Sequence, residues 1–304
     1  MRLQHKAIRT EETYTYWIGL YIDFLIQYGN GLADSKSRFE AFLTRLANRG
    51  VSASTQNQAF NAILFLYEQV RKEKLGDIKA LRAHRPTQHR TALSRSDTLK
   101  LLEHVKDRSG YSTRLVVRLL YGCGLRVSEP LTLRIKDVDV AGSKLFIRGA
   151  KGGKDRVVGV PCGLMSELVL QMEKARSQWQ IDVSNGLPVE IPGELAKKYK
   201  GAPFSWQWAW VFPSHCACKH PRTGELVKYR MHEANVQRAV KLAAKEVGLE
   251  FLASPHILRH CFATHVLDQG ANIRDLQAAL GHAHLDTTMC YVHAHSERII
   301  SPLA

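Results

Sequence analysis

Apolar residues recur at helical spacing in three segments near the start of the chain. The segments are YTYWIGLYIDFLIQYG (14–29), FEAFLTRLANRG (39–50) and STQNQAFNAILFLYEQVRKEK (54–74). Apolar positions three or four residues apart form one face of an α-helix. Gly50 is suited to end the second helix, and Ser54 to cap the third. The pattern predicts a small domain made only of helices.

A polar segment then interrupts the apolar pattern. ALRAHRPTQHRTALSRSD (80–97) is rich in arginine and histidine and has no apolar period. Polar segments of this kind often separate domains. We therefore expect a helical domain over 1–85, a basic linker over 86–97 and a second domain over 98–304.

The second domain has a mixed pattern. LKLLEHV (99–105) and TRLVVRLLYGCG (113–124) have helical periodicity, whereas SKLFIRGAKGGKDRVVGVP (143–161) has two short strand-like runs around a glycine-rich turn. Such a pair of runs predicts a β-hairpin. Further helical segments follow, so the predicted fold class is mostly α with a small antiparallel β-sheet, an α+β architecture.

Three of the five tryptophans of the chain lie within GAPFSWQWAWVFPS (201–214). The spacing of two between Trp206, Trp208 and Trp210 predicts a strand with the three rings on one face. We expect most of this stripe to pack against the domain. The alternative is a set of rings on which nucleobases stack.

The charge balance indicates a polyanionic partner. Lys and Arg number 43 against 28 Asp and Glu, for a net charge of +15. Nucleic acid is the natural partner of such a chain, although basic charge can also serve solubility alone. No small-molecule substrate is indicated.

Cysteine usage and hydropathy indicate where the protein works. The six cysteines form no paired framework, and no apolar run resembles a signal peptide or a membrane span. We therefore expect a cytoplasmic protein with no membrane partner. HCACKH (215–220) is a weak metal motif because no second matching pair exists, so we expect no metal there.

The segment SPHILRHCFATHVLDQG (254–270) carries the strongest chemical signal. Ser254 is a good N-cap and Pro255 suits a first helical position. His256 then falls in the first turn, with Arg259 three residues on along the same face. A helix start favours phosphate, so the pair predicts a phosphate cradle with a proton shuttle. Either residue alone is commonly structural.

Other segments add charged and nucleophilic groups. The motif GLRVSE presents Arg126 on a turn between two apolar segments, and the hairpin tip offers Lys151. GHAHLDTTMCYVHAH (281–295) contains His282, directly after a glycine suited to end a helix, and Tyr291. A lone tyrosine in such a place is usually a core residue.

Taken in order, these pieces closely resemble the tyrosine site-specific recombinases. The matching motifs are GLRVSE, the hairpin lysine in GAKGGKDR, HILRH with FATH, and LGH before the tyrosine. The intervals are 3 residues from His256 to Arg259, 23 more to His282 and 9 more to Tyr291. The resemblance spans nearly the whole chain. It implies that 1–85 is a SAM-like, core-binding DNA-binding domain and that the second domain is catalytic.

The resemblance implies DNA cleavage and rejoining through a 3′-phosphotyrosine link. The positions that match the family's catalytic set are Tyr291, Arg126, Lys151, His256, Arg259 and His282, with Glu129 in support. Tyr291 corresponds to the nucleophile. Fixed guanidinium groups suit the charge that develops on the non-bridging oxygens, so Arg126 and Arg259 are expected to clamp the scissile phosphate.

The other matching residues are expected to move protons or orient the site. A tyrosine needs help to lose its proton, and His256 is the expected acid/base partner. Lys151 would protonate the leaving 5′-oxygen, with Lys154 as the alternative. His282 would hydrogen-bond the phosphate, and Glu129 would orient the site. The set implies no metal and no cofactor.

The spacing within the second domain indicates which group of the family the chain resembles most. Lys151 and His256 are 105 residues apart, longer than expected for a compact Xer-type or phage-type enzyme. The surplus, LPVEIPGELAKKYKGAPFSWQWAWVFPS (187–214), resembles the insertion of the integron integrases. Those enzymes insert and excise gene cassettes, and they recognise a folded single-stranded cassette site through bases that protrude from its hairpin.

This resemblance suggests residues that contact DNA bases. The expected contact comes from a helix near 194–199 that is braced by the tryptophans, and Tyr229 and Arg230 stand where histidines are expected. Aromatic and guanidinium groups both stack on bases. The candidate DNA-binding residues are Trp206, Trp208, Trp210, Tyr229, Arg230, Lys197 and Lys198.

The expected assembly is a homotetramer on DNA, because recombination holds two sites together. The partners would be a folded single-stranded cassette site and a duplex platform site. Two alternatives stay open: an Xer-type or phage-type recombinase that acts only on duplex DNA, and a catalytically silent DNA-bridging protein.

Overall fold

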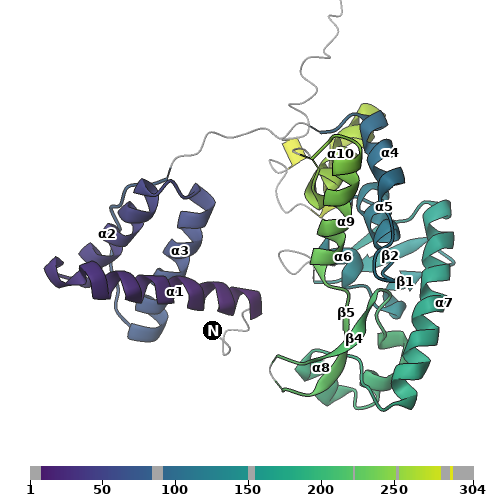
Figure 1. Cartoon of the computed structure of the whole chain (residues 1–304), viewed down its shortest axis with the longest axis horizontal. Coiled ribbons are helices and arrows are strands. Elements are labelled where there is room, and N and C mark those ends of the chain that lie inside the picture. Colours follow the sequence, from purple (N-terminus) through teal and green to yellow (C-terminus); the bar gives the residue numbers. More distant parts are fainter. Residues whose placement is uncertain are drawn as a thin grey trace, which may run out of the picture. The chain divides into compact units, whose positions relative to one another are not determined.

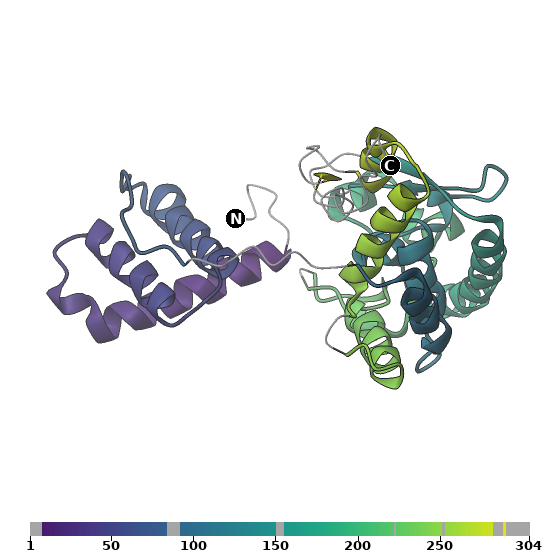
Figure 2. The same cartoon turned by 90° about the horizontal axis from the view of Figure 1, so that it is seen from above.

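The chain divides into two compact units. The computed structural model describes residues 8–83, 92–149, 155–221, 223–250, 253–281 and 288–289. The first unit is Met1–His89 and the second is Arg90–Ala304 (Figures 1 and 2).

The first unit is helical, as the periodicity predicts. Its elements are α1 (Ile8–Tyr28), a 3₁₀ turn (Gly29–Gly31), α2 (Ser35–Asn48), α3 (Ala53–Phe65) and a π-helical segment (Leu66–Arg71). Helix α1 packs across α2 and α3 (Figure 1). The core is aromatic: Phe39 is fully buried, and the buried Tyr21 and Tyr67 share a 2.8 Å hydrogen bond between their hydroxyls.

The helix ends of this unit follow standard capping chemistry. Gly50 adopts a positive φ of 71° after α2, and it donates to Ala47 O while Val51 donates to Leu46 O, which is a Schellman motif. The cap of α3 is Ser52, whose side chain accepts from Thr55 N. The prediction of Ser54 as the cap was therefore wrong by two residues.

A buried amide closes the end of the first unit. Gln56 donates to Leu43 O (2.9 Å) and Leu81 O (2.7 Å) and accepts from Ala83 N (3.0 Å). Since a buried amide without partners is costly, these bonds hold residues 81–83 against the helices.

The second unit combines helices with small antiparallel sheets, so the predicted fold class is confirmed. Its helices are α4 (Arg95–His104), α5 (Thr113–Gly122), α6 (Ser128–Leu131), α7 (Cys162–Ser184), α8 (Gly193–Lys198), α9 (Glu233–Glu246), α10 (Pro255–Asp268) and α11 (Ile273–Leu280). Its strands are β1 (Val138–Asp139), β2 (Lys144–Ile147), β3 (Arg156–Gly159), β4 (Pro213–Lys219) and β5 (Leu226–Arg230). Short 3₁₀ turns cover Ile135–Asp137, Ala202–Phe204 and Trp206–Trp208.

Helix α5 is the centre of this unit. It packs against α7, α9 and α10 (Figure 1), and its residues Val116, Val117, Leu119 and Leu120 have no exposed surface. The first sheet has the order β1-β2-β3 and the second is the β4–β5 pair. The predicted hairpin is present in the pairing of Leu145 with Val158.

The second unit begins before the end of the expected linker. Leu93 is buried in its core, donates to Cys261 Sγ (3.3 Å) and accepts from His265 Nε2 (2.9 Å). Ser94 then caps α4 by accepting from Asp97 N. Residues 93–97, which we expected in the linker, are thus part of the second unit.

The tryptophan segment is not a strand, so that prediction was wrong. Residues 202–204 and 206–208 form 3₁₀ turns, and only Trp210 makes a bridge, to Arg134. The three rings therefore meet different neighbours. Packing against the domain is confirmed for Trp206, which lies on the main core, and for Trp210, which is buried. Residues 215–219 of the HCACKH segment lie on β4.

We predict that Gly124→Ala destabilises the second unit by about 2–5 kcal/mol. Gly124 has a φ of 62°, and an added Cβ would overlap the Phe262 ring. A left-handed residue costs roughly 1–2 kcal/mol, and an overpacked core about 1–3 kcal/mol more. Urea unfolding monitored by circular dichroism measures the loss.

Gly186→Ala is the matched control for this substitution. Gly186 has a φ of 68° with nothing within 4 Å of an added Cβ, so it carries the backbone cost alone. Equal losses at the two positions would contradict the overlap with Phe262.

Candidate active site

The candidate site begins where α5 ends and the chain turns. Gly124 adopts the left-handed conformation, and the short helix α6 follows with Glu129 in its first turn. The turn places Arg126 three residues before Glu129, so that both side chains project from one short segment. The predicted position of Arg126 on a turn between apolar segments is confirmed.

Glu129 is the centre of a cluster of arginines. Its carboxylate accepts from the backbone N of Arg126 (2.7 Å) and from Arg126 Nη1 (2.9 Å). It also accepts two bonds from Arg156, at 2.8 Å from Nη1 and 2.7 Å from Nη2. Arg259 Nη1 lies 3.7 Å from the same carboxylate. One buried acid therefore joins three guanidinium groups.

Arg259 joins α10 to two other segments. Its Nη1 donates to Gly124 O (2.8 Å) and its Nη2 to Leu280 O (2.6 Å). The side chain is only 6% exposed, whereas that of Arg126 is 21% exposed. Arg126 is thus the more accessible of the two predicted phosphate-binding arginines.

Arg156 is a member of this cluster that sequence reasoning missed. It begins β3, and its side chain is 7% exposed. Its Nε donates to Ala279 O (2.9 Å) at the end of α11. It lies two residues before the buried Val158, on the same face of the strand. A charged residue on a buried strand face requires a partner. This spacing of two from an apolar residue was the signal available in the sequence.

His256 lies near the start of α10, as its place in the sequence predicts. Ser254 occupies the N-cap position and Pro255 is the first helical residue, which leaves His256 exposed in the first turn. Gly281 ends α11 with a φ of 64°. Lys151, Lys154, His282 and Tyr291 lie outside the described residues.

The pKa of Glu129 shows which effect dominates in the cluster. Burial acts to raise this pKa, but the hydrogen bonds and charges of Arg156 and Arg126 outweigh burial, so the pKa lies below its ordinary value. The carboxylate is therefore ionised at neutral pH. Three arginines against one glutamate leave two formal positive charges, which suits an anion such as a phosphodiester.

A second polar network anchors the segment expected as an insertion. Arg134 is buried, and it donates to Trp208 O (2.8 Å) and Glu190 O (2.8 Å). Its guanidinium carbon lies 3.1 Å from the centre of the Trp210 ring. Burial lowers the pKa of Arg134 to about 10, and the charges of Glu190 and Asp137 limit that decrease. Arg134 therefore carries its charge at neutral pH.

Residues 211–212, near the C-terminal end of this segment, belong to the core of the second unit. Val211 and Phe212 are fully buried, and Val211 N donates to Leu133 O (3.0 Å). A buried ion pair between Lys228 and Asp182 (3.1 Å) lies beside it. The segment is thus an integral part of the second unit.

Lys198, Tyr199 and Trp208 of this segment form an aromatic and basic cluster together with Lys136. We call these four residues the insertion cluster. The rings of Trp208 and Tyr199 are 6.3 Å apart. Lys136 Nζ lies 2.9 Å from the centre of the Trp208 ring, and Lys198 Nζ lies 5.4 Å from that of Tyr199. Tyr199 is 47% exposed and Trp208 is half-buried. The expected helix near 194–199 is present as α8.

The other candidate contacts occupy different surroundings. Trp206 packs against Trp179 of α7 in a tilted arrangement, with ring centres 5.5 Å apart. Tyr229 lies 6.2 Å from the Trp210 ring and 5.9 Å from the Arg230 guanidinium. Burial and the charge of Glu190 raise the pKa of Tyr229. Lys197 is in α8, and its side chain is not among those that the structure describes.

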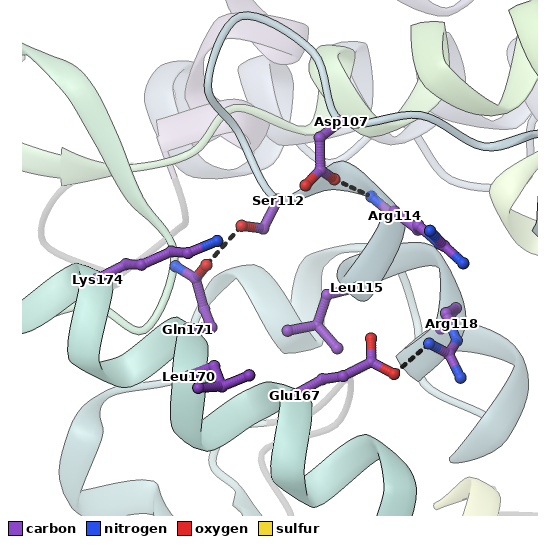
Figure 3. A pocket seen from close by; sticks show the side chains of 9 residues that line it. All are labelled: Asp107, Ser112, Arg114, Leu115, Arg118, Glu167, Leu170, Gln171 and Lys174. Atoms are coloured by element: carbon purple, nitrogen blue, oxygen red, sulfur yellow. Dashed lines mark hydrogen bonds and ion pairs between the residues drawn. The ribbon is translucent and has the colours of Figure 1, made fainter.

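A pocket of about 360 Å³ lies between α5 and α7, away from these clusters (Figure 3). Its side chains pair with their neighbours: Arg118 with Glu167, Ser112 with Gln171 (2.5 Å), and the Arg114 backbone with Asp107 (2.9 Å). Among the described residues, none of those that line the pocket is a predicted catalytic residue.

No group of three or more His, Cys, Asp or Glu side chains in the described ranges could hold a metal ion. Within the same ranges, no helix has the length and apolar character needed to cross a membrane.

Comparisons with known proteins agree with this architecture. Residues 91–298 match the phage integrase family, and residues 1–77 match the phage integrase N-terminal SAM-like domain. An Escherichia coli protein named integrase/recombinase is 37% identical over 297 residues, which cover 96% of this chain and 86% of that protein. Tyrosine recombinase XerA of Thermococcus kodakarensis is 32% identical, with coverage of 98% and 89%.

Solved structures show the same fold. XerH site-specific recombinase bound to palindromic difH substrate has a TM-score of 0.60 at 20% identity, with coverage of 94% of this chain and 77% of that chain. The Tn1549 transposon integrase in complex with transposon right end DNA has a TM-score of 0.57 at 17% identity, with coverage of 94% and 93%. The chain belongs to the phage integrase family and is a tyrosine recombinase, an enzyme of DNA strand transfer.

Proposed function

We propose that this recombinase is of the integron type, which inserts and excises gene cassettes and uses a folded single-stranded cassette site as substrate. The observation that carries the proposal is the insertion cluster. A half-buried tryptophan and an exposed tyrosine lie side by side with two lysines, on a segment that Arg134 anchors to the second unit. This arrangement provides flat rings for a base and cations for its phosphate.

The proposed chemistry uses the arginine cluster as the phosphate site. Arg126 and Arg259 bind the non-bridging oxygens of the scissile phosphate, and the two uncompensated positive charges stabilise the transition state. Glu129 orients both guanidinium groups, as its contacts with them support. His282 adds a hydrogen bond to the phosphate.

The proposed cleavage transfers the phosphoryl group from the 5′-oxygen to Tyr291. The Tyr291 hydroxyl oxygen forms a bond to phosphorus while the bond to the 5′-oxygen breaks. His256 takes the tyrosine proton, and Lys151, or Lys154 as the alternative, protonates the 5′-oxygen. Rejoining is the reverse, with a 5′-hydroxyl from the partner strand. The exposed position of His256 at the start of α10 supports its access to substrate.

The insertion cluster would receive a base that protrudes from the cassette hairpin. Trp208 and Tyr199 are the stacking rings, and Lys198 and Lys136 are the neighbouring cations. Trp206 would have a supporting role because it packs on Trp179, and Trp210 and Tyr229 likewise because Trp210 packs on Arg134 and Tyr229. Arg230 and Lys197 would add phosphate contacts. The assembly would be a homotetramer that holds a cassette site and a duplex platform site.

A second candidate is a recombinase that acts on duplex DNA only. The similarity to tyrosine recombinase XerA, 32% identical over 98% of this chain, favours it. In that case the insertion cluster would have a structural role.

The nucleophile is tested by Tyr291→Phe. Wild-type protein is mixed with a labelled single-stranded cassette-site hairpin, or with the same site as a duplex, and covalent adducts are separated on denaturing gels. We expect adduct mainly on the hairpin from the wild type and none from the variant, which keeps its DNA affinity. Adduct from the variant would exclude Tyr291, and wild-type adduct mainly on the duplex would favour the second candidate.

The base contact is tested by Trp208→Ala. Loss of one stacked base costs about 1–3 kcal/mol, so we expect hairpin affinity to fall roughly five- to 150-fold while duplex affinity is unchanged. Phe204→Ala is the control, since Phe204 is a 44% exposed aromatic of the same insertion. Equal losses on hairpin and duplex, or the same loss from Phe204→Ala, would count against a base contact at Trp208.

The anchoring role of Glu129 predicts a pH dependence. Because the folded-state pKa of Glu129 is lowered, its contribution to stability is complete above the unfolded value of 4.5 and is lost as the pH falls toward the folded pKa. Glu129→Gln should therefore be less stable than wild type by about 3–5 kcal/mol at neutral pH, with a gap that narrows below the unfolded pKa. Urea unfolding at several pH values measures the gap.

Glu167→Gln is the control for this experiment. Glu167 pairs with Arg118 at a 35% exposed site, where an ion pair contributes about 0–1 kcal/mol. A gap for Glu129→Gln that stays constant with pH would show that the carboxylate charge is not what stabilises the cluster.

A further inference from the structure

Arg156 directs all of its side-chain nitrogens at protein acceptors. Its Nη1 and Nη2 donate to the Glu129 carboxylate, and its Nε donates to Ala279 O. The side chain is 7% exposed, compared with 21% for Arg126. All the side-chain nitrogens of Arg156 are therefore engaged with protein acceptors.

The bidentate pair with Arg156 occupies both oxygens of Glu129. Such fork-to-carboxylate pairs are the strongest and most directional of the charged hydrogen bonds. Arg126 contributes one side-chain bond to the same carboxylate, and Arg259 lies at 3.7 Å. Without Arg156, the buried Glu129 carboxylate would need other donors. The nearest are the two arginines that the proposed function assigns to the phosphate.

Arg156 also holds the segment that precedes His282. It donates to Ala279 O, and Arg259 donates to the next carbonyl, Leu280 O. Cations stabilise the C-terminal end of a helix. An added Cβ at Gly281 would lie 2.9 Å from Arg156 Cδ, so the arginine stem fits closely against this turn. The same side chain thus ties β3 to the end of α11.

We propose that Arg156 is a positioning residue for strand cleavage. It serves as the dedicated counter-ion of Glu129, so that the charge of Arg126 and Arg259 remains directed at the scissile phosphate. The inference rests on the proposed roles of Arg126 and Arg259. Arg156 acts through Glu129 and touches no reacting atom.

The test compares two substrates in single-turnover adduct formation. One is the labelled cassette-site oligonucleotide with a normal scissile phosphate. The other carries a methylphosphonate there, which replaces one charged non-bridging oxygen by a methyl group. A misplaced catalytic group costs on the order of 100-fold in rate, so we expect Arg156→Lys to lose about that factor on the phosphate. On one methylphosphonate diastereomer the loss should be about tenfold or less, with DNA affinity unchanged on both.

Arg148→Lys is the matched control. Arg148 follows the other strand of the hairpin, is 56% exposed and pairs with Asp137 and Asp155. It should lose no rate on either substrate. An equal loss for Arg156→Lys on both substrates would overturn the proposal, because a general structural defect does not depend on the charge of the phosphate.

Arg126→Lys in the same assay separates this inference from the proposed function. If Arg126→Lys lost no rate, the proposed phosphate clamp would fail whatever Arg156 does. Arg126→Lys could lose more rate on the normal phosphate than on the methylphosphonate while Arg156→Lys shows no such difference. In that case only the inference about Arg156 would fail.

A double variant covers the case in which Arg156→Lys fails to fold. Glu129→Gln with Arg156→Met leaves no buried acid that requires a counter-ion. If Arg156 acts through Glu129, this double variant folds and cleaves at the same rate as Glu129→Gln alone. A further loss of tenfold or more from Arg156→Met in that background would refute the proposal.

Discussion

The second unit depends on one buried carboxylate. Glu129 contacts arginines from its own turn, from β3 and from α10, and two of these arginines continue to the last carbonyls of α11. A buried charge is tolerated only when it is paired and hydrogen-bonded. The turn after α5, the hairpin and α10 must therefore reach their places together. The result is a group of cations whose geometry exists before any substrate binds, which is the condition under which electrostatic catalysis is strongest.

The insertion obeys the same constraint at a second place. Arg134 is buried with its donors directed at two backbone carbonyls of the insertion, and its guanidinium covers the Trp210 ring. Apolar contacts of Val211 and Phe212 add the remaining attachment. The aromatic surface at Trp208 and Tyr199 is consequently carried by a rigid base rather than by an independent loop.

Features with a strong local period could be predicted from the sequence. The helices of both units and the β2–β3 hairpin follow from apolar spacing, and the turn at Arg126 from its flanking apolar segments. The tryptophan segment could not be, because a spacing of two over five residues fits a short 3₁₀ turn followed by one extended residue as well as a strand. The start of the second unit at Leu93 depends on tertiary contacts with Cys261 and His265, which leave no local pattern.

The residues of the candidate site also differ in how well the sequence predicts them. Ordered motifs singled out Arg126, Glu129, His256 and Arg259, whose surroundings the structure describes. Their roles, like those of Tyr291, Lys151 and His282, stay predictions. Arg156 escaped notice because its partner is 27 residues distant, and nothing near it in the sequence shows that pairing.

Arg134 also has a consequence for how such an enzyme can change over generations. Its two carbonyl partners belong to the segment 187–214, so a deletion that removed this segment in one step would leave a buried guanidinium without those acceptors. A charge left in that state costs several kcal/mol, a large fraction of the stability of a typical domain. Shortening the segment would first require an uncharged residue at position 134. A segment held by a buried charge of this kind therefore resists deletion more strongly than an exposed loop does.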